Sequence, residues 1–305
     1  MLNAFTVDVE EYFQVHNFED RIRRDSWPER ESRLAGALDR LLALLERHRV
    51  RGTFFILCWD DARMRPFVRA IRDAGHELAS HGSSHRLVYD QDPATFRAEV
   101  ERSKAYLEEV SGQPVLGYRA PSYSVTGRSL WALAELARAG FRYDSSIYPM
   151  RRRRYGIPGA PRHPHRRPEG LVEFPLTTWR CGRFNVPAAS GAYLRLLPLA
   201  ISVRAIRQHN AAGHPAVVNV HPWELDPAQP RVSGGYLGGL THYWNLHRTE
   251  ARLDALLGRF PFTTMRECLE RAGWLGADGA GPGTMAARSA EGANGATLDA
   301  ASGPA

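Results

Sequence analysis

Short apolar runs with strand character alternate with longer amphipathic segments along most of this chain, and this alternation restricts the folds open to it. A run at 4–9 precedes a segment at 32–48 whose leucines recur at helical spacing. A run at 53–57 precedes a second helical segment at 62–74. Repeated units of this kind predict parallel strands joined by helical crossovers.

The later part of the chain continues the pattern. Further strands are predicted at 76–79, 115–118, 141–143, 172–174, 216–220 and 262–264, and further helices at 92–110, 128–139, 194–212, 249–257 and 265–272. About seven or eight parallel strands favour one distorted (β/α) barrel over two separate domains. An open doubly wound sheet is the alternative, but no GxGxxG follows the first strand, so a nucleotide site lacks its usual signal.

The formal net charge of +7 comes from one part of the chain. Residues 151–167 hold seven arginines and no acid, and the rest of the chain is balanced. Three prolines and two glycines in this segment argue against a nucleic-acid recognition helix. We expect its arginines, Arg151 and Arg152 among them, to attract an acidic or lipid-linked glycan or an anionic membrane surface.

Cysteine use and the chain ends carry few signals. Three widely spaced cysteines without a CxxC pattern predict reduced thiols. No secretory signal is visible, and no apolar run reaches the ~18–20 residues of a spanning helix. These features predict a cytoplasmic protein, with peripheral contact at the inner membrane as an option. Ala and Gly fill 17 of the 31 positions at 275–305, which predicts a disordered tail.

Polar residues follow several predicted strands at their carboxyl ends, where barrel enzymes carry their reactive groups. Asp8 and Glu10 lie two residues apart after the first strand, so they share a face, and two adjacent carboxylates need a cation or a proton between them. His81 and His85 follow a later strand and could present nitrogens to one metal ion if the segment forms a helical turn. Each pair alone also fits ordinary surface or structural roles.

Three further strand ends carry single candidates. Arg119 could hold a carboxylate with two hydrogen bonds, and Asp144 could orient a histidine or an arginine, or cap a turn. His221 follows an apolar strand and precedes a proline, which suits an acid/base group. Among the aromatic residues near these ends, Trp223 is the best candidate for contact with a substrate, and Tyr123 is a second.

Taken together, these segments resemble the polysaccharide deacetylases, the NodB-type carbohydrate esterases of family 4. The resemblance spans about 2–273 and is carried by TVDVEEYF (6–13), SHGSSH (80–85), RAPSYS (119–124), YDSS (143–146) and VNVHPWEL (218–225). The segments at 221–231 and 242–257 also resemble the branch found beside exosortase and exopolysaccharide gene clusters, which carries its own C-terminal extension. The resemblance implies a deacetylase domain at 1–274, with the barrel at about 1–224 and the extension at about 225–274.

The resemblance also implies the site residues. Metal ligands would be Glu10, His81 and His85, and three N/O ligands with open positions fit Zn²⁺, although other divalent ions bind such sets. The more common family form has two adjacent aspartates, whereas here Val9 separates Asp8 from Glu10. Glu10 is assigned as the ligand because it shares a face with Asp8, but a kink at the strand end would make Glu11 the ligand instead.

The family pattern assigns the remaining roles to one residue each. Asp8 would be the general base and Arg119 would keep it ionised. The backbone N–H of Ser122 would bind the oxyanion, His221 would be the general acid, and Asp144 would support that histidine or the arginine.

The implied function is metal-dependent removal of N-acetyl groups from amino sugars of a polysaccharide, as in exopolysaccharide biosynthesis. Two alternatives remain open at this point. One is hydrolysis of another C–N amide, such as a ureide or a peptide-like group, on the same fold. The other is a catalytically inactive protein that only binds polysaccharide.

Overall fold

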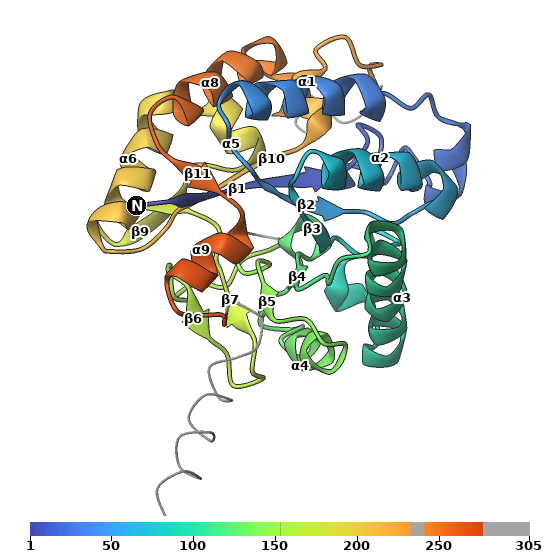
Figure 1. Cartoon of the computed structure of the whole chain (residues 1–305), viewed down its shortest axis with the longest axis horizontal. Coiled ribbons are helices and arrows are strands. Elements are labelled where there is room, and N and C mark those ends of the chain that lie inside the picture. Colours follow the sequence, from blue (N-terminus) through green and yellow to red (C-terminus); the bar gives the residue numbers. More distant parts are fainter. Residues whose placement is uncertain (153, 233–240, 277–305) are drawn as a thin grey trace, which may run out of the picture.

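The computed structural model describes residues 1–152, 154–232 and 241–276, and within them a nine-stranded sheet forms the centre of the molecule (Figure 1). The strands follow the order β10-β1-β2-β3-β4-β5-β7-β6, and β11 pairs with β1. Their bounds are β1 (Asn3–Val9), β2 (Thr53–Ile56), β3 (Glu77–Ser80), β4 (Gly117–Tyr118), β5 (Tyr143–Asp144), β6 (His165–Arg166), β7 (Val172–Glu173), β10 (Val217–Val220) and β11 (Phe262–Thr263). Within this sheet β6 alone runs antiparallel, and the sheet curls into a partly open barrel. The predicted α/β fold is confirmed.

Helices cover the outer face of this sheet, as Figure 1 shows for α1, α2 and α3. Their bounds are α1 (Leu34–Arg47), α2 (Asp61–Asp73), α3 (Pro93–Ser111), α4 (Trp131–Arg138), α5 (Gly191–Leu196), α6 (Leu199–Ala211), α8 (Thr249–Leu257) and α9 (Met265–Arg271). Helix α3 begins with a side-chain cap, because the Asp92 side chain accepts hydrogen bonds from the N–H groups of Ala94 and Thr95. Pro93 at the first turn has no N–H to leave unpaired.

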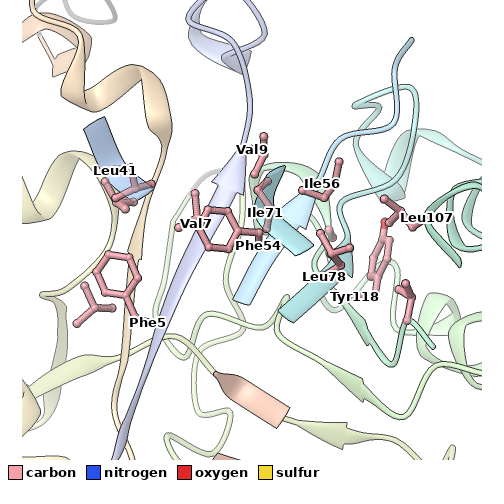
Figure 2. Packing of buried hydrophobic residues seen from close by; sticks show 14 of the residues in the cluster. Phe5, Val7, Val9, Leu41, Phe54, Ile56, Ile71, Leu78, Leu107 and Tyr118 are labelled. Carbon is pink, nitrogen blue, oxygen red and sulfur yellow. The ribbon is translucent and has the colours of Figure 1, made fainter. Parts of the chain in front are cut away.

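Successive side chains of β1 point alternately to the core and to the inside of the barrel. Phe5, Val7 and Val9 point to the outer face, where they pack among side chains from the helices, such as Leu41 of α1 (Figure 2). Each such buried side chain contributes about 1.5–3 kcal/mol to folding. The intervening residues therefore face the inside of the barrel, and Asp8 is one of them.

The predicted helix at 194–212 is wrong as a single element. Two helices, α5 and α6, occupy this stretch, and the chain is extended at Leu197, with φ −88° and ψ 155°. The break follows from Pro198, which has no N–H to donate and disfavours the helical conformation of the residue before it.

Two short antiparallel strands are an addition that the apolar pattern did not predict. Strands β8 (Thr178–Cys181) and β9 (Phe184–Pro187) form a hairpin of their own, outside the main sheet. Their residues are half-exposed or exposed over most of their length, so they lack the continuous apolar run of the buried strands.

The C-terminal segment adds to the same sheet. Strand β11 runs beside the start of β1, where Asn3 is in register with Phe262, and α9 packs against β1. All three cysteines are free thiols. Among the described residues no helix is both long enough and apolar enough to cross a bilayer. The predicted disordered tail lies, from 277 on, outside the described residues, and the predicted boundary near 224 stays a prediction.

Candidate active site

Four strands deliver polar side chains to one edge of the barrel. Asp8 lies near the end of β1 and Glu10 just beyond it, His81 follows β3, Arg119 follows β4, and His221 follows β10. All four strands run parallel, so their carboxyl ends meet at this edge. A cavity of about 300 Å³ opens there, and its lining includes Asp8, Glu10 and His221.

Glu10 and two histidines form a compact cluster of nitrogen and oxygen donors. The Oε1 atom of Glu10 lies 2.8 Å from Nε2 of His81 and 2.9 Å from Nε2 of His85, and all three residues are buried. His81 Nδ1 lies 2.8 Å from the carbonyl oxygen of Arg119 and donates to it, which leaves Nε2 free to bind a metal. One carboxylate oxygen and two imidazole nitrogens are a donor set that fits a divalent ion such as Zn²⁺.

The electrostatics of this cluster favour an ionised carboxylate. Burial by itself would raise the pKa of Glu10. The charge of His85 and hydrogen bonds from both histidines outweigh burial and hold that pKa well below its usual value. An anionic Glu10 between two imidazoles is the form that coordinates a cation.

The segment at 81–85 forms a loop and not a helical turn, and this loop brings the two histidines together. Gly82 and His85 both adopt positive φ, at 76° and 54°. Glu99 of α3 holds this loop, since its Oε1 atom accepts hydrogen bonds of 2.8 Å from the N–H groups of Ser83 and Ser84. A Cβ atom at Gly82 would lie 2.9 Å from that same oxygen, so glycine is needed there.

The neighbouring Glu11 points away from the histidines. Its carboxylate accepts a hydrogen bond from the Ser32 hydroxyl and another, of 3.1 Å, from the Arg33 N–H. These contacts place Glu11 at the start of α1, so of the two alternatives left open by the sequence, the geometry favours Glu10 as the ligand.

Asp8 is held by a buried arginine. Arg119 is fully buried, and its Nη1 atom donates to Asp8 Oδ1 at 2.7 Å and to Asn219 Oδ1 at 2.6 Å. Asn219 in turn donates from Nδ2 to the other Asp8 oxygen at 2.9 Å. The guanidinium lies 4.0 Å from the ring centre of Phe55. Burial would raise the pKa of Asp8, but the charge of Arg119 lowers it below its usual value.

His221 faces Asp8 across the cavity and is supported by a carboxylate. Its Nε2 atom lies 3.7 Å from Asp8 Oδ2, and its Nδ1 atom donates to Glu224 Oε1 at 2.7 Å. The other Glu224 oxygen accepts from Nε of Arg195 at 2.5 Å, and both residues of this ion pair are fully buried. Burial would lower the pKa of His221, but the hydrogen bond to Glu224 and the nearby carboxylates raise it to about 9.

The sequence did not lead to a predicted role at the site for Glu224 or Arg195. Glu224 had a usable signal, since it lies three residues after His221 in a turn that Pro222 starts, and that spacing returns its side chain to the histidine. Arg195 had none, because its ion pair with Glu224 joins residues 29 positions apart.

Asp144 does not occupy the predicted place beside the histidine. Its carboxylate accepts hydrogen bonds from the hydroxyl and the N–H of Ser146, and in the described part of the chain it bonds to neither His221 nor Arg119. The Ser146 hydroxyl also accepts from the Ala120 N–H at 2.8 Å. Asp144 therefore supports the loop that carries Arg119 through Ser146, and Glu224 holds His221.

The predicted oxyanion donor and its neighbour line the cavity in an unusual conformation. Ser122 and Tyr123 both have positive φ, at 52° and 56°. The Tyr123 hydroxyl accepts from Asn219 Nδ2 at 2.8 Å and donates to Asp8 Oδ2 at 3.4 Å. Tyr123 thus contacts the predicted base, in addition to bordering the space where a substrate would bind.

Trp223 lines the cavity and packs against two histidines. Its ring stacks on His221 at 5.2 Å between ring centres and on His242 at 4.1 Å. The residue is 6% exposed, so little of it is open to a sugar. Contact of Trp223 with a substrate stays a prediction, and the structure shows in addition that the ring packs against His221.

Of the arginines predicted to bind substrate, Arg152 lies beside the cavity and Arg151 does not, while the neighbouring Arg154 lines it. Arg152 donates from Nε to the Tyr193 hydroxyl at 3.0 Å, and Tyr193 lines the cavity. Arg154 lines the cavity directly, whereas Arg151 is exposed outside it.

Two family models match adjacent parts of the chain. Residues 25–143 match the family described as polysaccharide deacetylase. This part of the chain is therefore similar to the polysaccharide deacetylases. Residues 145–270 match a domain of unknown function, DUF3473. Glu10 and Asp8 precede the first match and His221 lies within the second, so the clustered site draws on residues beyond the matched deacetylase segment.

Two curated relatives are similar to part of the chain. "Peptidoglycan deacetylase-like protein FGM2" of Gibberella zeae (strain PH-1) is 30% identical over 110 residues, which is 35% of this chain. "Putative polysaccharide deacetylase YheN" of Bacillus subtilis (strain 168) is 31% identical over 126 residues, which is 38% of this chain. These matches cover 32% and 43% of the relatives' own lengths, so the chain spans less than half of each.

A solved structure shares the fold over a longer stretch. It is a "putative polysaccharide deacetylase from Mycobacterium smegmatis", with a TM-score of 0.56 and 22% sequence identity. The likeness covers 88% of this chain and 89% of the other. It supports the same barrel architecture.

Proposed function

We propose that this protein is a metal-dependent hydrolase that removes N-acetyl groups from amino sugars of a polysaccharide or of its precursor. The observation that carries the proposal is the convergence of three groups on one cavity: the Glu10–His81–His85 cluster, the Asp8–Arg119 pair and His221. The similarity to the polysaccharide deacetylases supports it, because deacetylases of this family generally depend on a metal and act on acetylated glycans.

Glu10, His81 and His85 would hold the metal. A bound divalent ion lowers the pKa of a water molecule toward ~7 and polarises the acetamide carbonyl. The second nitrogen of His81 is engaged by the Arg119 carbonyl, which fixes the orientation of the ring toward the cluster.

Asp8 would take the proton of the attacking water. Arg119 and Asn219 keep its carboxylate ionised and fix its direction, while Oδ2 remains on the side of His221. The water oxygen bonds to the acetamide carbon, and the carbonyl oxygen gains negative charge. The Ser122 N–H would donate to that oxygen, a contribution often worth about 3–4 kcal/mol.

His221 would then protonate the leaving amine nitrogen as the C–N bond breaks, which yields acetate and a free amino sugar. A pKa of about 9 keeps His221 protonated at neutral pH, as an acid requires. Glu224 is a positioning residue in this scheme, because it holds the proton-bearing ring toward the cavity.

The substrate would be an intermediate of exopolysaccharide biosynthesis, either the polysaccharide itself or a lipid-linked precursor. Support comes from the resemblance of 221–231 and 242–257 to the exopolysaccharide-associated branch, and from the second family match over 145–270.

Glu224→Gln should lower kcat about tenfold to a hundredfold, with a smaller effect on KM. A neutral amide cannot stabilise the imidazolium, and a hydrogen bond to a charged group is worth about 1.5–3 kcal/mol. The pKa of His221 should fall, so the alkaline limb of the kcat profile should move from about pH 9 toward neutrality. Glu250→Gln, on the exposed side of α8, is the matched control. An unchanged alkaline limb in Glu224→Gln would rule out this role.

To test the proposal, the zinc-loaded protein is incubated with N-acetylated amino-sugar oligomers, and acetate is measured. In a separate incubation with a cyclic ureide, ammonia and carbamate products are measured. We expect acetate and free amine from the oligomers only. Turnover of the ureide alone would contradict the proposed substrate class and favour the ureide alternative. Binding of the oligomers without any product would indicate an inactive binding protein.

A further inference from the structure

The cavity is charged differently at its base and at its mouth. Among the described residues that line it, the carboxylates are Asp8 and Glu10, both buried and engaged at the base by Arg119 and by the two imidazoles. The mouth is bordered by Arg154 and by the hydroxyl groups of Tyr155 and Tyr193.

Arg154 keeps its charge uncompensated at this mouth. Its Nη1 atom donates to Asn17 Oδ1 at 3.4 Å, and within the described ranges no carboxylate pairs with it. Some arginines of the molecule pair with acids, as Arg65 does with Glu109 and Arg271 with Glu267. Arg154 differs from other arginines without such a partner in that it lines the cavity. Arg154 therefore has free donors beside the space where a substrate would lie.

The wall behind Arg154 is fixed by contacts. Arg152 donates to the Tyr193 hydroxyl, and the hydroxyl groups of Tyr155 and Tyr193 lie 2.7 Å apart. The Tyr155 ring stacks on the buried ring of Tyr148, with 5.8 Å between centres and an interplanar angle of 22°. These contacts hold Arg152 and Tyr155, on either side of Arg154 in the sequence, against the wall of the cavity.

The segment that carries Arg154 is rich in arginine, since residues 149–200 contain ten arginines and two acids. Of its described arginines, Arg154 and Arg195 line the cavity, and Arg195 is paired with Glu224. Arg154 therefore supplies the uncompensated arginine charge of the lining, and such a charge raises the local concentration of anionic ligands.

We infer that the mouth of the cavity is a subsite for an anionic group, a carboxylate or a phosphate, carried by the substrate next to the acetylated sugar, with Arg154 as the residue that binds it. The inference rests on the proposed function and narrows its substrate to acidic N-acetylated glycans or phosphate-linked precursors. Arg154 would determine specificity, since Asp8, His221 and the metal cluster perform the reaction.

The test compares three defined probes by calorimetry on the zinc-loaded full chain: neutral chitotetraose, a hyaluronan tetrasaccharide that carries carboxylates, and UDP-N-acetylglucosamine that carries phosphates. We expect at least one acidic probe to bind about tenfold tighter than chitotetraose, by the usual strength of one charge-assisted contact. High salt should reduce that preference, and the preferred probe identifies the anionic group.

Arg154→Gln should remove most of this tenfold preference, whereas Arg69→Gln, an exposed change on α2, should keep it. Equal binding of all three probes, or a preference that survives Arg154→Gln, would overturn the inference. It would also be overturned if Arg154→Gln weakened binding to phosphatidylglycerol vesicles alone, because the arginine would then serve a membrane. Acetate release from chitotetraose is followed in parallel and reports on the proposed function separately.

Discussion

Replacing His81 and His85 together with alanine should abolish metal binding and acetate release. The two imidazoles supply two of the three donor atoms that converge within 4.8 Å, and Glu10 alone is a poor site for a transition metal. Loss of the ion removes several kcal/mol of transition-state stabilisation, which corresponds to a fall in kcat of roughly a thousandfold or more. Metal content by elemental analysis and acetate release should fall together.

The double variant needs two controls, because both histidines are buried. Thermal unfolding in the presence of a chelator compares wild type and variant without metal, and separates loss of the fold from loss of the ion. His247→Ala, at an exposed position just before α8, should keep full metal content and activity. A folded double variant with wild-type metal content would place the metal elsewhere.

Asp8→Asn should retain the metal and lose turnover. Asparagine has the same shape but cannot take a proton at neutral pH, so the attacking water loses its base. Since general-base catalysis contributes roughly a hundredfold to ten-thousandfold, kcat should fall by about that factor while substrate affinity changes little. Elemental analysis and steady-state kinetics on the same preparation check both parts.

The matched control for this change is Asp39→Asn, which lies exposed on α1. It should leave metal content and kcat as in wild type. If Asp8→Asn lost its metal in a folded protein, Asp8 would belong to the ligand set, and the base would have to be sought elsewhere.

The positions of the parallel strands and the main site residues followed from local patterns. Buried parallel strands show as continuous apolar runs, so the ends of β1, β3, β4 and β10 could be located, and with them Asp8, His81, Arg119 and His221. Their convergence needed only the rule that parallel strands end at one edge of the sheet.

The remaining features depend on contacts that no local pattern reports. The Arg195–Glu224 ion pair joins α5 to the turn after β10, and the Trp223 ring stacks on His221 and on His242, which lies 19 residues away. The spacing of His81 and His85 suits a helical turn, but the geometry of the loop is set by Gly82 and by the distant Glu99.

Metal-dependent acetate release tests the account most directly. The protein is stripped of metal, titrated with Zn²⁺ against an N-acetylated amino-sugar oligomer, and acetate and free amine are measured together. The account predicts no release without the ion, release that saturates at one ion per chain, and equal amounts of acetate and amine. Release that is independent of the ion, or no release from any acetylated amino sugar by a fully loaded protein, would contradict it.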